Sequence, residues 1–230
     1  MRQTLNSGLA SMGLSLSPAQ VDLFCRFGQA LLEKNQVMNL TAITQPQAVA
    51  QLHFLDSIAV LTQLSLKDRS LIDVGCGAGF PGVPLKIAEP SVQLTLLDSL
   101  TKRVAWLQEL LPQLGIDAQC VSGRAEDFVK DHRESYDVAT SRAVARLNIL
   151  CELCLPYVKP GGYFLAMKGA QVQQELDEAR HAIEALGGAV EQVYSYRVAD
   201  AVHHVVLIKK LRPTPKQYPR RYSKLKQQPL

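Results

Sequence analysis

The chain is built around one stretch, Leu71-Ile72-Asp73-Val74-Gly75-Cys76-Gly77-Ala78-Gly79-Phe80-Pro81-Gly82. Its apolar start, residues 71–74, predicts a buried strand. The four glycines that follow predict a loop, because glycine allows sharp turns and lets a ligand approach the main chain closely. Residues 83–88 can then begin a helix. A strand, a glycine loop and a helix make the first half of a βαβ unit, whose ligand binds at the carboxyl end of the strand.

Two classes of ligand compete for this loop. The spacing Gly77-x-Gly79-x-x-Gly82 fits the dinucleotide fingerprint, which is a weak signal by itself. The spacing Asp73-x-Gly75-x-Gly77-x-Gly79 resembles the first motif of methyltransferases that use S-adenosylmethionine. The second class is favoured because Asp73 has no role in the dinucleotide fingerprint, and because Pro81 lacks the N–H that a pyrophosphate would need there. A loop that only turns the chain is the alternative without a ligand.

Length and composition indicate one α/β core with an extension. The chain has 230 residues, of which 47% are hydrophobic and 20% charged, as in ordinary globular proteins. No window reaches the length of a membrane-spanning helix, and residues 1–17 do not form a signal peptide. We therefore expect a cytoplasmic protein without a membrane partner.

The cysteines suggest free thiols rather than disulfides, because their number, five, is odd. Cys151-x-x-Cys154 has the spacing of half a zinc site or a redox pair, but no second ligand pair stands at zinc spacing. Because the pair lies in the apolar run 147–158, two buried thiols on a helix are favoured. No metal site is predicted.

The positive charge is concentrated at the carboxyl terminus. Residues 206–230 hold eight of the 25 basic residues and no acid, which leaves 17 basic against 21 acidic residues in the rest of the chain. A mildly acidic body with a basic tail indicates a polyanionic partner, and a solubilising tail is the alternative. The basic tail is bounded at 212–230, and its stretch 213–230 is expected to be extended or mobile because it shows no periodicity.

Residues 1–63 predict a helical extension. Ser17, Pro18 and Gln20 form a helix start, with Ser17 as the N-cap and Gln20 three residues later. A further helix is expected from Pro46 to about Leu61. It contains His53, which is a candidate ligand or base, although a single histidine beside apolar residues is more often a packed side chain.

Residues 64–211 predict a sheet with alternating helices. Strands are expected at 70–75, 93–98, 118–122, 136–141, 162–167, 189–198 and 203–210. The pattern favours a mostly parallel sheet with helices on both faces. The last two strands leave no room for a helix between them, so they should form a hairpin that ends the sheet with an antiparallel strand.

Three further candidates follow the ends of strands. Asp98 ends the second strand 23 residues after Gly75, where an acid binds ribose hydroxyls in nucleoside-binding βαβ units; a helix cap is the alternative. The turn after the third strand contains Ala125 and Glu126, which suit an adenine, unless the acid is simply solvated. Arg142 follows the fourth strand, at the mouth of the crevice, where a surface ion pair is the alternative.

Several motifs occur in the order found in one known family. They are Asn39-Leu40-Thr41, His53-Phe54-Leu55-Asp56-Ser57, the stretch Asp73 to Gly82, Leu96-Leu97-Asp98-Ser99, Lys102-Arg103, Ser141-Arg142-Ala143 and Leu165-Ala166-Met167-Lys168-Gly169. The combination resembles the ribosomal RNA small-subunit methyltransferase G family, formerly called glucose-inhibited division protein B. Cys76 departs from the serine or threonine expected there. The segment Lys216-Gln217-Tyr218-Pro219-Arg220 is similar to a basic Tyr-Pro-Arg segment of many members.

The resemblance implies a Rossmann-like class I fold and methylation of N7 of one guanine in 16S ribosomal RNA, with S-adenosylmethionine as cofactor. Carried over by motif, the cofactor contacts are Gly75, Phe80, Ala125 with Glu126, and Arg142; Asp98 joins them from the ribose argument. Candidate RNA contacts are Arg142, Lys168, Lys216, Arg220 and Arg221. No catalytic residue is assigned, because N7 carries a lone pair and no proton, so that in-line displacement needs positioning rather than a base.

Three alternatives stay open at this point. A nicotinamide-dependent oxidoreductase shares the fold class but leaves Asp73 unexplained. An RNA-binding module that holds S-adenosylmethionine without methyl transfer is the second alternative, and a methyltransferase with a different acceptor is the third. The expected partner is the small ribosomal subunit, and the protein is expected to be a monomer.

Overall fold

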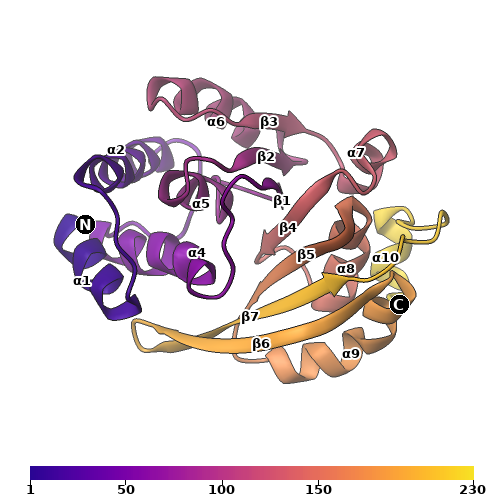
Figure 1. Ribbon diagram of the computed structural model, residues 1–230. Coiled ribbons are helices and arrows are strands. Elements are labelled where there is room, and N and C mark those ends of the chain that lie inside the picture. Colours follow the sequence, from indigo (N-terminus) through magenta and orange to yellow (C-terminus); the bar gives the residue numbers. More distant parts are fainter.

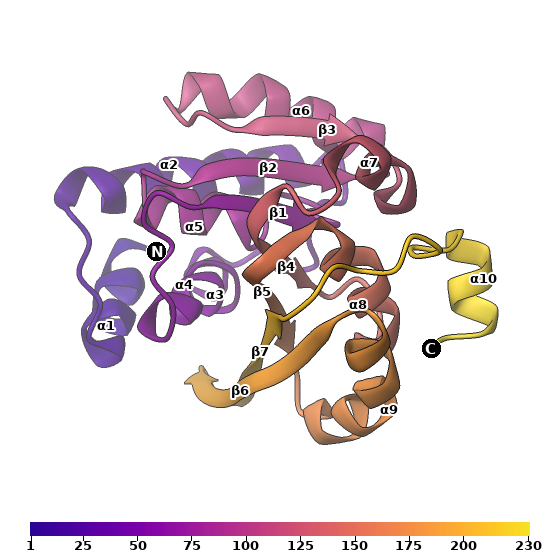
Figure 2. The same cartoon turned by 45° about the vertical axis from the view of Figure 1, so that its right-hand side comes forward.

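A seven-stranded mixed sheet runs through the computed structural model, which describes residues 1–230 (Figure 1). The strand order is β3-β2-β1-β4-β5-β7-β6, which Figure 2 shows from top to bottom. The strands are β1 (Ser70–Val74), β2 (Gln93–Asp98), β3 (Gln119–Ser122), β4 (Tyr136–Arg142), β5 (Val158–Lys168), β6 (Gly188–Val198) and β7 (Ala201–Lys210). All seven predicted strands are present, so the expected α/β class is confirmed.

The sheet is parallel from β3 to β5, and β7 runs antiparallel to both of its neighbours. The predicted hairpin of β6 and β7 is confirmed, but the antiparallel strand lies inside the sheet and β6 forms the edge. Burial explains this order. The run Val205–Ile208 of β7 is buried between two strands, whereas β6 exposes Glu191 and Gln192 to solvent, as suits an edge strand.

Helices cover both faces of the sheet. They are α1 (Arg2–Met12), α2 (Pro18–Asn35), α3 (Pro46–Val49), the π-helical turn η1 (Ala50–Leu55), α4 (Asp56–Ile58), the 3₁₀ turn η2 (Ala59–Thr62), α5 (Gly82–Ala88), α6 (Thr101–Gln113), α7 (Ala125–His132), α8 (Leu147–Cys154), the 3₁₀ turn η3 (Leu155–Tyr157), α9 (Val172–Ala185) and α10 (Tyr222–Gln227). One apolar core joins the sheet to α1–α6, and a second joins its other face to α7–α10. Neighbouring strand residues alternate between them: Leu71 packs in the first core and Ile72 in the second.

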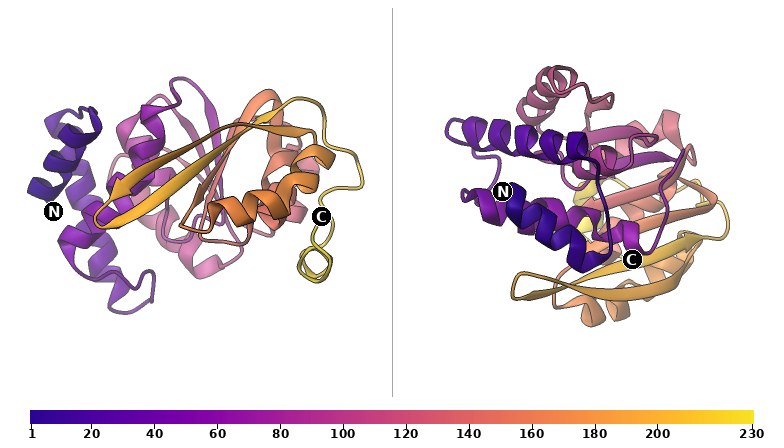
Figure 3. Two further views of the ribbon diagram at one scale, coloured as in Figure 1. Left: turned by 90° about the horizontal axis from the view of Figure 1, so that it is seen from below. Right: turned by 60° about the vertical axis from the view of Figure 1, so that its left-hand side comes forward.

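The N-terminal helices lie at the end of the molecule opposite α10 (Figure 3). The predicted helix start is confirmed, since Ser17 Oγ accepts a hydrogen bond from Gln20 N and Gln20 Oε1 accepts one from Ser17 N. Phe27 of α2 lies 5.6 Å, centroid to centroid, from Phe80 of the glycine loop. The extension therefore braces the loop through a shared core, and the boundary at residue 63 stays a prediction.

The carboxyl-terminal segment 212–230 packs on the body, so the expectation of an extended or mobile tail is wrong. Leu225 of α10 is completely buried beside α8 (Figure 1). Glu152 of α8 is also completely buried, and Arg220 binds it through N, Nε and Nη2, with Nη2 lying 2.6 Å from Oε2. A buried carboxylate needs a countercharge, and the tail supplies it.

The two cysteines of the Cys-x-x-Cys spacing lie on one helix. Cys151 and Cys154 are buried free thiols on α8, as predicted. No helix combines the length and the apolar character that crossing a membrane requires.

Candidate functional site

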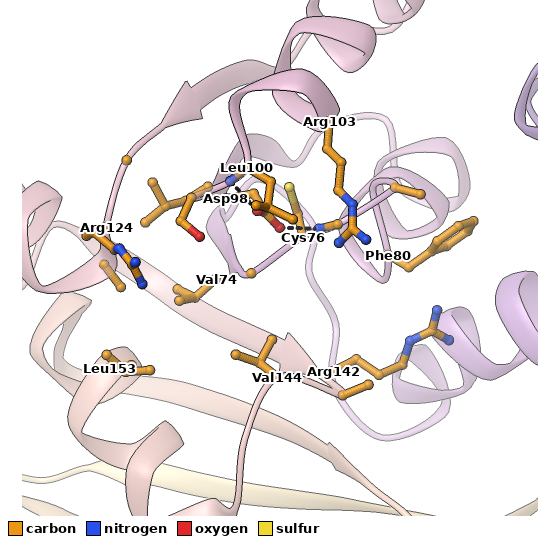
Figure 4. A pocket seen from close by; sticks show the side chains of 18 of the residues that line it. Val74, Cys76, Phe80, Asp98, Leu100, Arg103, Arg124, Arg142, Val144 and Leu153 are labelled. Carbon is orange, nitrogen blue, oxygen red and sulfur yellow. Dashed lines mark hydrogen bonds between the residues drawn. The ribbon is translucent and has the colours of Figure 1, made fainter. Parts of the chain in front are cut away.

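A cavity of about 460 Å³ opens at the carboxyl ends of the central strands (Figure 4). We call it the glycine-loop cavity, because the loop after β1 forms its floor. The other walls come from the ends of β2 and β4, the turn after β3, α8 and α10, and from residues 40, 41 and 53 of the N-terminal extension. All six predicted cofactor contacts line this one cavity: Gly75, Phe80, Asp98, Ala125, Glu126 and Arg142.

The glycine loop has a conformation that a side chain would disturb. Gly75 has a φ of +76°, and a Cβ there would lie 2.4 Å from Cγ2 of Val144. Oδ2 of Asp73 accepts a hydrogen bond of 2.8 Å from Gly82 N, which ties the strand to the end of the loop. Asp73 is fully buried, and burial raises its pKa to about 7. Asp73 therefore holds the loop in shape from beneath the cavity.

Asp98 is the carboxylate at the centre of the cavity. Its Oδ2 accepts a hydrogen bond of 2.8 Å from Gly77 N, and its Oδ1 accepts one of 2.8 Å from Leu100 N (Figure 4). These two main-chain donors fix the carboxylate against the glycine loop. Each carboxylate oxygen can accept a second hydrogen bond, so Asp98 keeps acceptor capacity toward a ligand.

The turn after β3 forms one end of the cavity. Glu126 Oε1 accepts a hydrogen bond of 3.2 Å from Tyr222 N, and the Arg124 guanidinium lies 5.9 Å from the centroid of the Tyr222 ring. Figure 4 shows Arg124 at this end, with Phe80 and Arg142 at the other and Asp98 between them. Sequence analysis missed Tyr222, since no local pattern links it to a turn 96 residues earlier.

Arg142 lies in the wall between the glycine-loop cavity and a second cavity of about 590 Å³. Its Nη1 lies 2.6 Å from Asp56 Oδ2, and its Nη2 donates to His53 Nδ1 at 3.1 Å. Because arginine can only donate, Nδ1 of His53 is unprotonated and Nε2 donates to Thr41 Oγ1. Burial, aided by the Arg142 charge, lowers the pKa of His53 to about 4. His53 is therefore neutral near pH 7, and its ring stacks 4.4 Å from that of Phe80.

The second cavity is lined by paired charged groups, and we call it the charged cavity. Its members include Asp56, Arg142, Lys168, Glu175 and His203. Oδ1 of the buried Asp56 accepts hydrogen bonds from His203 Nδ1 at 2.6 Å and from the Tyr196 hydroxyl at 2.8 Å.

Lys168 lies in the charged cavity as an ion-paired group. Its Nζ lies 2.6 Å from Glu175 Oε2 and donates to the Ala145 carbonyl at 2.8 Å, and only 7% of its side chain is exposed. In the sequence, the motif around His53 includes Asp56. His203 and Tyr196 come from the β6–β7 hairpin, and no sequence motif pointed to them.

The three tail cations that were expected to contact RNA differ in their surroundings. Arg220 is engaged by Glu152, whereas Lys216 and Arg221 are exposed and form no ion pair. Lys216 and Arg221 are therefore the two whose charges are available to a partner. No group of three or more histidine, cysteine or acidic side chains is arranged to hold a metal ion.

Solved structures share this fold at low sequence identity. The mitomycin 7-O-methyltransferase MmcR matches 80% of this chain and 60% of its own with a TM-score of 0.56 and 17% identity. TYW2 of M. jannaschii, solved in complex with AdoMet, matches 63% of this chain and 69% of its own with a TM-score of 0.52 and 13% identity. These likenesses support the Rossmann-like class I methyltransferase fold.

Sequence comparison is more specific. A protein of Alkaliphilus oremlandii named ribosomal RNA small subunit methyltransferase G is 46% identical over 236 aligned positions, covering 100% of this chain and 99% of the relative. A protein of the same name from Thermoanaerobacter sp. strain X514 is 44% identical, covering 99% and 98%. The family model GidB, described as rRNA small subunit methyltransferase G, matches residues 20–205. The chain therefore belongs to the rRNA small subunit methyltransferase G family.

Proposed function

We propose that this protein transfers a methyl group from S-adenosylmethionine to N7 of a guanine in the 16S ribosomal RNA of the small subunit. Family membership supports the reaction class. The observation that carries the assignment of the site is that all six predicted cofactor contacts line the glycine-loop cavity. The charged cavity adjoins it through Arg142 and offers space for an acceptor.

The proposed orientation of S-adenosylmethionine follows the cavity from end to end. Ala125 and Glu126 contact the adenine, and Asp98 accepts hydrogen bonds from the ribose hydroxyls. The cofactor can approach the main chain at Gly75 closely because glycine carries no Cβ. The methionine part then extends toward Phe80 and Arg142, at the other end of the cavity (Figure 4). The residues present fit the cofactor, which supplies an electrophilic methyl group on a sulfonium.

The proposed acceptor site is the charged cavity. The N7 lone pair of guanine attacks without prior loss of a proton, so the protein must align the acceptor rather than deprotonate it. Arg142 and Lys168 are the candidates that hold the guanine edge or a phosphate. Their ion pairs with Asp56 and Glu175 keep both side chains at the cavity wall. His53, neutral and stacked on Phe80, keeps the junction between the cavities apolar on one side.

The tail contributes charge to RNA binding in this proposal. Lys216 and Arg221 are exposed and unpaired, and cations of this kind release counterions from a phosphate backbone on binding. Binding of the RNA should therefore weaken steeply with salt. Arg220 anchors the segment to Glu152 and places its neighbours.

Methyl transfer from radiolabelled S-adenosylmethionine to 30S subunits and to free 16S RNA tests the proposal. We expect label in 7-methylguanosine, and the better substrate shows whether the enzyme acts on assembled particles or on naked RNA. Label in another nucleoside would contradict the acceptor assignment. Cofactor binding by calorimetry without any label would favour the RNA-binding module instead.

A further inference from the structure

The carboxyl-terminal segment reaches the end of the glycine-loop cavity at which we place the adenine. The main-chain N–H of Tyr222 donates to Oε1 of Glu126 at 3.2 Å. The structure records no hydrogen bond to Oε2 of the same carboxylate, and Glu126 lines the cavity. One oxygen of Glu126 is thus bound by the tail, and the other keeps its acceptor capacity.

The tail is anchored firmly on both sides of this contact. Before Tyr222, Arg220 binds the buried carboxylate of Glu152 through three nitrogen atoms. After it, Leu225 is completely buried in the core of the second sheet face. The position of the Tyr222 N–H is therefore set by the protein body, and it can hold the flexible Glu126 side chain in one orientation.

We propose that the carboxyl-terminal segment is a positioning element of the cofactor site. The Tyr222 N–H orients Glu126 so that its Oε2 accepts a hydrogen bond from the amino group of adenine. This inference rests on the proposed function. The oriented carboxylate selects adenine over hypoxanthine, since hypoxanthine presents a carbonyl oxygen in place of the amino group. A site built around one hydrogen bond rejects an analogue that leaves its polar group unpaired.

Tyr222→Pro removes the N–H with little disturbance of the backbone. Tyr222 is the first residue of α10, a position at which proline is readily accommodated. The preceding Arg221 has φ −61° and ψ 141°, a conformation that residues before proline favour. Tyr222→Ala is the matched control, because it removes the ring and its contact with Arg124 but keeps the N–H.

The measurement is calorimetric binding of S-adenosylhomocysteine and of its deaminated analogue S-inosylhomocysteine. We expect the wild type to prefer the adenine compound, and Tyr222→Pro to reduce this preference about tenfold, the scale of a hydrogen bond to a charged group. Tyr222→Ala should keep the preference. Glu126→Ala should abolish the preference. Adding Tyr222→Pro to Glu126→Ala should then change the preference no further, because the two residues act as a unit.

The outcomes separate the inference from the proposed function. If the wild type binds neither compound, the proposed function and the positioning role are both overturned. If the wild type prefers adenine and Tyr222→Pro keeps that preference, or weakens both compounds equally, only the positioning role is overturned. Leu225→Ala provides a second variant, since it loosens α10 while keeping the N–H. This variant should make the tail sensitive to protease and lower the preference for the adenine compound. A tail that protease cuts, together with an unchanged preference, would also overturn the inference.

Discussion

The two cavities that meet at Arg142 are built in different ways. The glycine-loop cavity takes its shape from the main chain, with Gly75 at positive φ and Asp98 held by two N–H groups. The charged cavity takes its shape from ion pairs, Arg142 with Asp56 and Lys168 with Glu175. The first is therefore sensitive to added atoms, and the second is sensitive to a missing partner. Three predictions test this difference, and a fourth concerns the basic tail.

Asp56→Ala should have the largest effect. It leaves Arg142 without its carboxylate at a largely buried position, which costs about 3–5 kcal/mol of unfolding free energy. Urea denaturation measures the loss. Asp177→Ala is the matched control, because its ion pair with Arg180 is exposed and should contribute less than about 1 kcal/mol. Equal losses in the two variants would contradict the view that buried charge pairing holds the charged cavity together.

The pH dependence of stability should have opposite signs for His53, at the junction of the two cavities, and for Asp73, beneath the glycine loop. The pKa of His53 falls from 6.5 to about 4 on folding, so unfolding binds a proton and stability is lost as the pH falls from 6.5 toward 4, by at most about 3 kcal/mol. The pKa of Asp73 rises from 3.8 to about 7, so its contribution is lost as the pH rises through the same range.

Variants separate these two contributions. Between pH 6.5 and 4, acid should destabilise His53→Gln less than the wild type. Over the same range, acid should destabilise Asp73→Asn more than the wild type. Unfolding free energies measured across this range check both differences. Parallel curves for the wild type and His53→Gln would show that His53 ionises normally in the folded protein.

Gly75→Ala should weaken cofactor binding about tenfold, the scale of one hydrogen bond to a charged group, since the loop that holds Asp98 through the Gly77 N–H is displaced. The new Cβ would meet Val144 at 2.4 Å, so the loop or its neighbour must move. Gly115→Ala is the matched control, with a similar φ of +71° but no atom within 4 Å. Both variants should lose stability through backbone strain. Equal affinities by calorimetry would show that strain alone matters.

Lys216→Ala should have the smallest effect. Removing one exposed cation should lower the slope of log affinity against log salt by about 1 for 16S RNA, with little change in stability. Lys67→Ala is the control, since this exposed lysine lies just before β1, at the amino ends of the parallel strands. Filter binding at several salt concentrations measures both slopes. Identical slopes would show that Lys216 does not contact the RNA.

Patterns of short range predicted much of the molecule. The capping box at Ser17 and the strand-loop-helix around Gly75 depend on residues close together in the chain, and both are present as expected. The order of the last two strands was harder to predict, because a hairpin can join the sheet through either of its strands. The strand that buries more apolar surface takes the interior position, and this choice depends on α8 and α9 as neighbours.

The residues of the candidate site also differ in whether the sequence could predict them. Gly75, Asp98 and Glu126 could be found in the sequence because parallel strands bring their carboxyl ends to one edge of the sheet, so that position in a βαβ unit implies proximity. The partners that several carboxylates find far away in the sequence could not be found in this way. Tyr222 meets Glu126, Arg220 meets Glu152, and His203 meets Asp56 across separations of 96, 68 and 147 residues. Local conformational preference and hydrophobic periodicity specify elements and their ends, whereas the pairing of buried charges depends on which surfaces folding brings together.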